Sequence, residues 1–122
     1  MLRYTPVLLL SLLLLASCAL VPGDSSFQEV SFTVAASAKH TIAVEVRAGH
    51  SLEGSFSVSG PENYIDFYIK DPAGGLAYGV VRAQGGHGFE ALAETGGIYT
   101  LYFDNSISFG SSRNISLRYR VR

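Results

Sequence analysis

Apolar and polar residues alternate with a period of two along most of the chain from position 27 onward. This alternation is typical of β-strands that bury one face, and no window shows the three-to-four spacing of an amphipathic helix. The segment 76–82 alternates less regularly than the others. The pattern predicts strands over residues 30–34, 41–47, 52–58, 64–70, 76–82, 89–93, 98–104 and 114–121.

Short stretches rich in turn-forming residues separate these segments. In DPAGG (71–75), Asp can accept backbone hydrogen bonds, Pro fixes φ, and Gly supplies a positive φ. Turns recur at intervals of roughly 8 to 12 residues, and no connection is long enough for parallel pairing. We therefore predict an all-β fold, an antiparallel, jelly-roll-like β-sandwich of about eight strands. The other predicted turns are AGH (48–50), GPEN (60–63), QGGHG (84–88) and TGG (95–97), with a loop at NSISFGSS (105–112).

The first 17 residues have the features of a signal peptide. One basic residue, Arg3, precedes an apolar run from Val7 to Ala16 that only Ser11 interrupts. Extended through Val21, the run reaches about 15 residues, whereas a membrane-spanning helix needs roughly 20. The segment therefore predicts export and not a membrane span.

The only cysteine of the chain, Cys18, follows Leu15, Ala16 and Ser17. Leu-Ala-Ser-Cys resembles the lipobox of bacterial lipoproteins, which implies removal of residues 1–17 and acylation of Cys18. Two or three acyl chains anchor a protein stably where one would be marginal. The alternative is an unused thiol in a discarded signal. We expect anchoring at the outer face of a bacterial membrane. Ala19 stands where an aspartate can retain lipoproteins at the inner membrane, so we expect the outer membrane if the cell has two.

Residues 18–26 contain Pro, Gly, Asp and Ser without periodicity and are predicted to be a flexible tether for a single domain, 27–122. The chain has a formal net charge of −1, which gives no general attraction for nucleic acid. Since Cys18 is the only cysteine, no disulfide within the chain can support the domain.

Two long stretches, NYIDFYIKDPAGG (63–75) and GGHGFEALAETGGIYTLYFDNSISFGSSRNISLRYRV (85–121), resemble the GOLD (Golgi dynamics) domain of eukaryotic secretory-pathway cargo receptors. The resemblance covers about 95 residues, 27–122, and implies a β-sandwich that acts through protein contacts without catalysis. The sequence departs from those receptors at Tyr102, where they carry a disulfide-bonded cysteine. They also continue into a coiled coil and a membrane helix, whereas this sequence stops at Arg122, so helix-driven oligomerisation is not expected.

Motifs for catalysis or metal binding are incomplete. GHSLEG (49–54) has Glu53 where the nucleophile elbow needs glycine, and GGHG (85–88) lacks the Lys-Ser/Thr of a phosphate loop. His40, His50 and His87 are too far apart in sequence for a compact zinc motif. We therefore predict no enzyme activity, no cofactor and no metal.

Polar loop ends form the first candidate site. Asp71, Asp104 and Asn105 could ligate calcium if their loops meet; otherwise each caps a turn.

A tyrosine face forms the second candidate site. Tyr64, Asp66 and Tyr68 share the polar side of one predicted strand, and Tyr102 is expected on a neighbouring one. Tyrosines offer a large contact area with a polar tip, although cross-strand aromatic pairs also stabilise sheets without any partner.

A basic strand forms the third candidate site. Arg118, Arg120 and Arg122 project together from the last predicted strand. They could contact anionic lipid or wall polymer, or they could keep an edge strand from pairing with a neighbour.

Together these features predict a lipid-anchored cell-envelope protein whose GOLD-like module binds or scaffolds another envelope protein. The alternative is a small module that binds carbohydrate or surface polymer through Tyr64, Tyr68 and Tyr102.

Overall fold

The computed structural model describes residues 26–122. The predicted signal peptide, Cys18 and all but the last residue of the tether lie outside the described residues. No helix in the described part of the chain is long and apolar enough to cross a membrane. Eight strands follow in order: β1 (Gln28–Val34), β2 (Lys39–Val46), β3 (Ser51–Ser59), β4 (Tyr64–Lys70), β5 (Leu76–Gln84), β6 (Gly86–Leu92), β7 (Gly97–Asp104) and β8 (Arg113–Val121).

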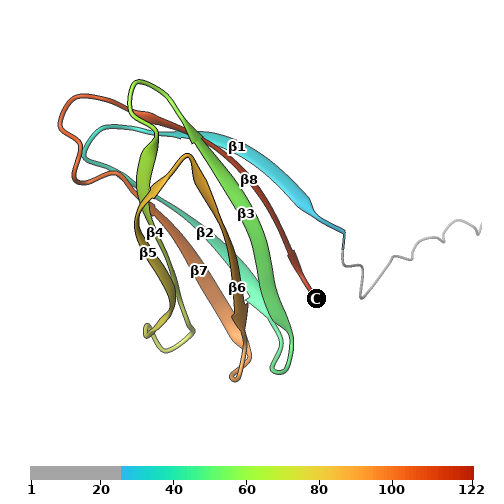
Figure 1. The fold of residues 1–122 in the computed structure, drawn as a ribbon. Helices are drawn as coiled ribbons and strands as arrows, with labels where there is room; N and C mark the ends of the chain where they lie inside the picture. Colours follow the sequence, from blue (N-terminus) through green and yellow to red (C-terminus); the bar gives the residue numbers. More distant parts are fainter. Residues whose placement is uncertain (1–25) are drawn as a thin grey trace, which may run out of the picture.

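The strands form two four-stranded antiparallel sheets, which Figure 1 shows as two layers. One sheet has the order β1-β8-β3-β6 and the other the order β2-β7-β4-β5. Successive strands thus mostly alternate between the layers, which is the jelly-roll arrangement of a β-sandwich. The predicted fold class is confirmed.

The core lies between the sheets and is rich in phenylalanine. The ring of Phe67 on β4 lies 4.8 Å from Phe56, 5.0 Å from Phe89 and 5.0 Å from Phe103, measured between ring centroids. Phe67 is fully buried. These four rings come from β4, β3, β6 and β7, so the period-two pattern of each strand contributes side chains to one shared core.

One predicted turn is wrong in extent. QGGHG (84–88) was expected to be a turn, but β5 runs through Gln84 and β6 begins at Gly86, so Gly85 alone connects them. Gly85 has a φ of 76° and Gly86 a φ of 135°, values that residues with a Cβ rarely adopt. Two consecutive glycines therefore let the chain pass from one sheet to the other in a single step.

The irregular alternation of 76–82 also has a physical reason. The pairing of β5 with β4 shifts register twice, between Ile65 and Phe67 and between Ile69 and Lys70. At the first shift Arg82 has a φ of 54°, and its backbone N–H donates to the Asp66 carboxylate at 2.8 Å. β5 is therefore a bulged edge strand, in which successive side chains do not simply alternate between faces.

Candidate functional site

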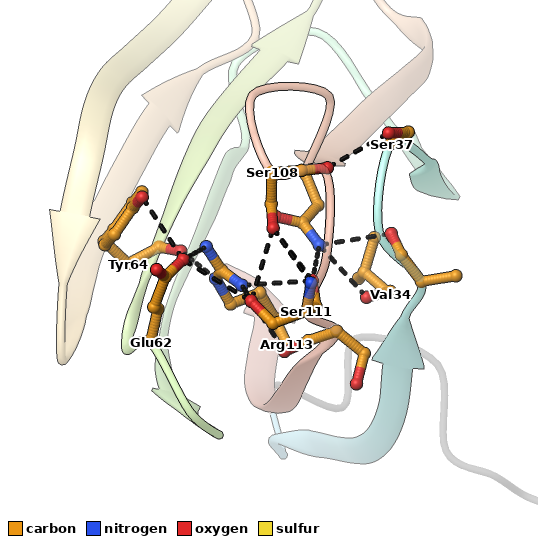
Figure 2. A network of polar contacts seen from close by, with 10 residues as sticks. Val34, Ser37, Glu62, Tyr64, Ser108, Ser111 and Arg113 are labelled. Atoms are coloured by element: carbon orange, nitrogen blue, oxygen red, sulfur yellow. Dashed lines mark hydrogen bonds and ion pairs between the residues drawn. The ribbon is translucent and has the colours of Figure 1, made fainter.

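The loop between β7 and β8, residues 105–112, is fastened to the sandwich by a buried asparagine. The Asn105 side chain is fully buried, and its Nδ2 donates to the carbonyl oxygens of Val34 at 3.3 Å, Ala35 at 3.1 Å and Ser111 at 3.0 Å. These contacts join the loop to the end of β1 (Figure 2). The loop also lies against the β1–β2 connection, where the Ser37 hydroxyl donates to the Ser108 carbonyl oxygen at 3.0 Å.

Arg113 holds the other end of this loop. It is fully buried, its Nε donates to the Tyr64 carbonyl oxygen at 2.6 Å, and its Nη1 donates to the Ser111 hydroxyl at 2.7 Å. Its Nη2 forms an ion pair with Glu62 at 2.9 Å, and Glu62 is half exposed. The guanidinium therefore connects β8 in one sheet to β4 in the other and to the loop, as Figure 2 shows.

The loop presents apolar side chains to solvent. Phe109 is 91% exposed, the highest value among the large exposed apolar residues, and Ile107 is 37% exposed. A depression of about 420 Å³ beside them is lined by Pro61, Glu62, Tyr64 and residues 107–111. Because Asn105 and Arg113 fix both ends of the loop, Phe109 is an apolar tip on a constrained support. In the following text "loop tip" means Ile107 and Phe109.

The predicted tyrosine face exists on the outer side of the β2-β7-β4-β5 sheet. Tyr68 and Tyr102 are register partners, and their rings stack with centroids 4.8 Å apart and planes at 12°. The Lys70 Nζ lies 5.3 Å from the Tyr102 ring centroid. Tyr64 lies at the start of β4, where the guanidinium of Arg113 is 4.8 Å from its ring centroid. Tyr64 thus adjoins both the tyrosine face and the depression beside the loop tip.

Tyr68 on the tyrosine face is hydrogen-bonded to a neighbouring carboxylate. The Tyr68 hydroxyl donates to Asp104 Oδ2 at 3.3 Å. Burial and the neighbouring Asp104 carboxylate raise the pKa of Tyr68. Burial alone would raise the pKa of Asp104, but hydrogen bonds from Ser106, the charge of Lys39 and the hydrogen bond from Tyr68 together lower that pKa. The phenol therefore stays neutral and the carboxylate charged, which suits a structural donor–acceptor pair better than a nucleophile.

The predicted loop-end acids do not converge. Asp66 pairs in register with Asp104, and Asp71 lies five residues further along the chain, so Asp71 and Asp104 are roughly 16 Å apart along the strand direction. Asp71 caps its own turn, accepting from the backbone N–H groups of Ala73 at 3.0 Å and Gly75 at 2.8 Å. The condition for a shared calcium site is not met.

The histidines lie on separate elements, and no group of three or more His, Cys, Asp or Glu residues within 26–122 could hold a metal ion. His40 on β2 stacks on Phe32 at 4.0 Å, His50 lies before β3, and His87 on β6 is 6.2 Å from Tyr78.

Arg118 and Arg120 on β8 and Arg122 just after it are paired with carboxylates. Glu53 accepts from Arg120 at 2.6 Å and from Arg122 at 3.1 Å, and Glu29 lies 3.5 Å from Arg118. Since β8 lies between β1 and β3, the interpretation of these charges as guards of an edge strand is wrong. Three arginines share two carboxylates, so one positive charge remains uncompensated among them, and contact with an anionic surface remains a prediction.

Sequence reasoning missed the loop tip and the buried polar groups beneath it. The signal for the tip was present, because Ile107 and Phe109 are apolar residues within a stretch of small polar ones. No signal marked Arg113 as buried, since its partners Glu62 and Tyr64 are about 50 residues away in the sequence.

None of the curated proteins matches the chain. Among solved structures, one similar fold is that of Aeromonas hydrophila PliG, a periplasmic lysozyme inhibitor of g-type lysozyme. The TM-score is 0.56 at 15% sequence identity, with 86% of this chain and 93% of that chain covered. The family model described as emp24/gp25L/p24 family/GOLD matches residues 29–122, nearly the whole of the described sandwich. The chain therefore belongs to the emp24/gp25L/p24 family/GOLD.

Proposed function

We propose that this protein is exported, anchored to the cell envelope through acylated Cys18, and binds another envelope protein through its GOLD domain, residues 27–122. The loop tip and the tyrosine face form the binding surface. Residues 18–26 serve as the tether. The proposal assigns no reaction, cofactor or nucleic-acid contact to the domain.

The single observation that carries this proposal is the exposure of Phe109 on a constrained loop. Aromatic side chains are enriched in protein interfaces and among the residues that dominate binding energy. Binding is weakened when a flexible loop must be ordered. The buried hydrogen bonds of Asn105 and Arg113 reduce that cost because they hold the loop before a partner arrives.

The similar fold supports recognition of a protein. PliG is described as an inhibitor of g-type lysozyme, and thus as a periplasmic protein that acts on another protein. At 15% identity the likeness concerns the fold, so the identity of the partner does not carry over.

The ring geometry favours a protein over a sugar as the ligand. Sugar rings bind by stacking on open aromatic faces, but Tyr68 and Tyr102 each use one face against the other. Tyrosine side chains combine a large apolar ring with a polar hydroxyl and are enriched in protein interfaces.

Replacement of Phe109 by Ala is expected to weaken partner capture. Hot-spot aromatics contribute about 2 kcal/mol or more, so the affinity should fall roughly thirtyfold. Crosslinking of the full-length protein in intact cells, with the partner identified by mass spectrometry, measures the loss. Leu92→Ala is the matched control, because Leu92 is also an exposed apolar residue, 59% exposed, at the opposite end of the sandwich.

Capture that survives Phe109→Ala but not Leu92→Ala would move the binding surface to the other end of the domain. A Tyr68→Ala variant separates the two ligand classes. If it loses binding to purified wall polymer while Phe109→Ala retains it, the carbohydrate alternative replaces the protein partner.

Anchoring is tested at Cys18 itself. We expect the mature amino-terminal peptide to carry acyl chains on Cys18, and Cys18→Ser to leave the protein uncleaved or to release it from the membrane fraction. Mass spectrometry and cell fractionation measure the two effects. A freely secreted, unacylated wild-type product would contradict the anchor but would leave the binding surface unaffected.

A further inference from the structure

Strand β2 forms a free edge of its sheet. The order β2-β7-β4-β5 leaves one side of β2 without a neighbouring strand, so its backbone N–H and C=O groups on that side can pair with another strand. β2 pairs with β7 over all its residues, from Lys39 opposite Asp104 to Val46 opposite Gly97, with no bulge. It is therefore a regular template for a further strand.

The other edge strands are less suited to this pairing. β5 is interrupted by two register shifts, and β6 begins at Gly86 with a φ of 135°. β1 is regular, but its only charged residue, Glu29, already lies 3.5 Å from Arg118 of the same chain. Bulges and shortened edges are common devices against edge-to-edge association, and β2 has none of them.

The charges of β2 match those of a second copy of the same strand. Lys39 and Glu45 are exposed on the same outer face, six positions apart, with Ile42 midway between them. In an antiparallel pair of β2 strands centred on Ile42, Lys39 of each copy lies opposite Glu45 of the other. Within residues 26–122 no basic group forms an ion pair with Glu45.

The charge pattern also favours this register over the one centred on Ala43. A shift of the centre to Ala43 would place Lys39 opposite Arg47 of the second copy, and like charges directly opposite are destabilising. Lys39 also lies beside Asp104 in its own chain, where its charge helps to lower the pKa of that carboxylate. The pairing therefore leaves the charge of Lys39 between two carboxylates.

Apolar side chains at the same edge remain incompletely covered. Ile42 and Val44 point toward the core but are only half-buried, in contrast to fully buried Val46. On the facing edge strand, Val30 of β1 is 40% exposed. A neighbouring strand beside β2 would cover part of this apolar surface, which adds a hydrophobic contribution to the backbone pairing.

We propose that two copies of this chain associate through their β2 strands, antiparallel and centred on Ile42, so that the two sheets join into one. In register, Tyr102 lies directly beside Thr41 of β2, so the tyrosine faces of both copies then lie on one continuous surface. The dimer presents two tyrosine faces on one side. This inference does not depend on the proposed function.

A cysteine at the two-fold axis tests the pairing. In the full-length protein, oxidation of intact cells is expected to convert Ile42→Cys to a disulfide-linked dimer. Directly opposite residues have Cα atoms about 4.5–5.5 Å apart, within the range that a disulfide bridges. Val44→Cys is the matched control on the same face, because its two copies would lie about 13 Å apart along the strands. Wild type, whose only cysteine is Cys18, provides the background.

Charge exchange tests the register on the exposed face of β2. Glu45→Lys places like charges opposite each other twice in the dimer and should weaken it about tenfold. The double variant Lys39→Glu with Glu45→Lys restores both pairs and should regain most of the affinity. Analytical ultracentrifugation of the detergent-solubilised full-length protein measures the dissociation constants.

The crosslinking and charge-exchange results decide whether the β2 strands pair in a dimer. A disulfide-linked dimer in Ile42→Cys but not in Val44→Cys, together with recovery of the dimer affinity in the double variant, supports the proposal. Absence of that crosslink in protein of normal abundance, or equal crosslinking of Val44→Cys, overturns it. If Ile42→Cys does not accumulate, the charge series decides, and a wild-type protein that stays monomeric, or an unchanged affinity in Glu45→Lys, overturns the proposal.

Discussion

Replacement of Arg113 by Ala is expected to destabilise the fold by about 3 kcal/mol, because a fully buried side chain and several of its hydrogen bonds are lost together. The change removes donors to the Tyr64 carbonyl oxygen, the Ser111 hydroxyl and Glu62 together, and it leaves a cavity where the buried guanidinium lay. Urea denaturation of the full-length protein, followed by the near-ultraviolet circular dichroism of its tyrosines, measures the difference in the free energy of unfolding.

Arg113→Lys is the matched control, because it keeps the charge and loses the planar fork. A single ammonium group cannot reach all three partners in the geometry of a guanidinium. We therefore expect the free energy of unfolding of Arg113→Lys to lie between those of wild type and Arg113→Ala. A free energy of unfolding within about 1 kcal/mol of wild type for Arg113→Ala would show that the surrounding polar groups are satisfied by water instead.

The same residue couples stability to the proposed binding surface. Arg113 contacts Ser111 in the loop and Tyr64 on β4, and these lie beneath the loop tip and at the edge of the tyrosine face. A partial loss of this contact would free the loop before it unfolds the sandwich. In Arg113→Lys, partner capture should therefore fall by a larger factor than the decrease in the amount of folded protein would explain.

The local structure of the chain could be predicted from the sequence. The alternation in YIDFYIK gives the bounds of β4, 64–70, as the structure has them, and Asp71 caps the following turn as its sequence indicates. The jelly-roll class followed from the number of strands and the shortness of their connections. These features depend on residues close together in the chain, so the spacing of apolar and turn-forming residues predicts them.

The order of strands in the sheets could not be predicted in the same way. Alternation assigns a side chain to one face of a strand, but it does not say which strand lies beside it. For this reason β8 was considered an edge strand, whereas it lies between β1 and β3, and its Arg120 pairs with Glu53, 67 residues away. The free edge of β2 likewise became visible only with the sheet order.

Buried polar residues in the loop were equally out of reach. The sequence indicates a calcium ligand or a turn cap at Asn105, because it follows Asp104 at the end of a predicted strand. In the structure its amide instead reaches Val34 and Ala35, about 70 residues away, and is fully buried. An exposed and a buried asparagine have the same local sequence signature, so only the packing of β1 against β8 distinguishes them.

Gly54 shows the same limit in the middle of a strand that was predicted correctly. In the sequence it simply continues the apolar side of β3 between Leu52 and Phe56. In the structure a Cβ atom at this position would lie 2.2 Å from the Arg118 carbonyl oxygen and 2.9 Å from Cζ of Phe89. The close approach of β8 to β3 therefore requires a residue without a side chain.

Gly54→Ala is expected to cost about 3 kcal/mol of folding free energy, at the upper end of the usual range for overpacking, because the nearest clash is with backbone and cannot be relieved by a rotamer change. Urea denaturation of the full-length protein measures it. Gly110→Ala is the control, since a Cβ atom there meets nothing within 4 Å and its stability should stay within about 0.5 kcal/mol of wild type. Equal stabilities for the two variants would mean that β3 and β8 can separate locally without loss, and that the sandwich does not depend on their close contact at Gly54.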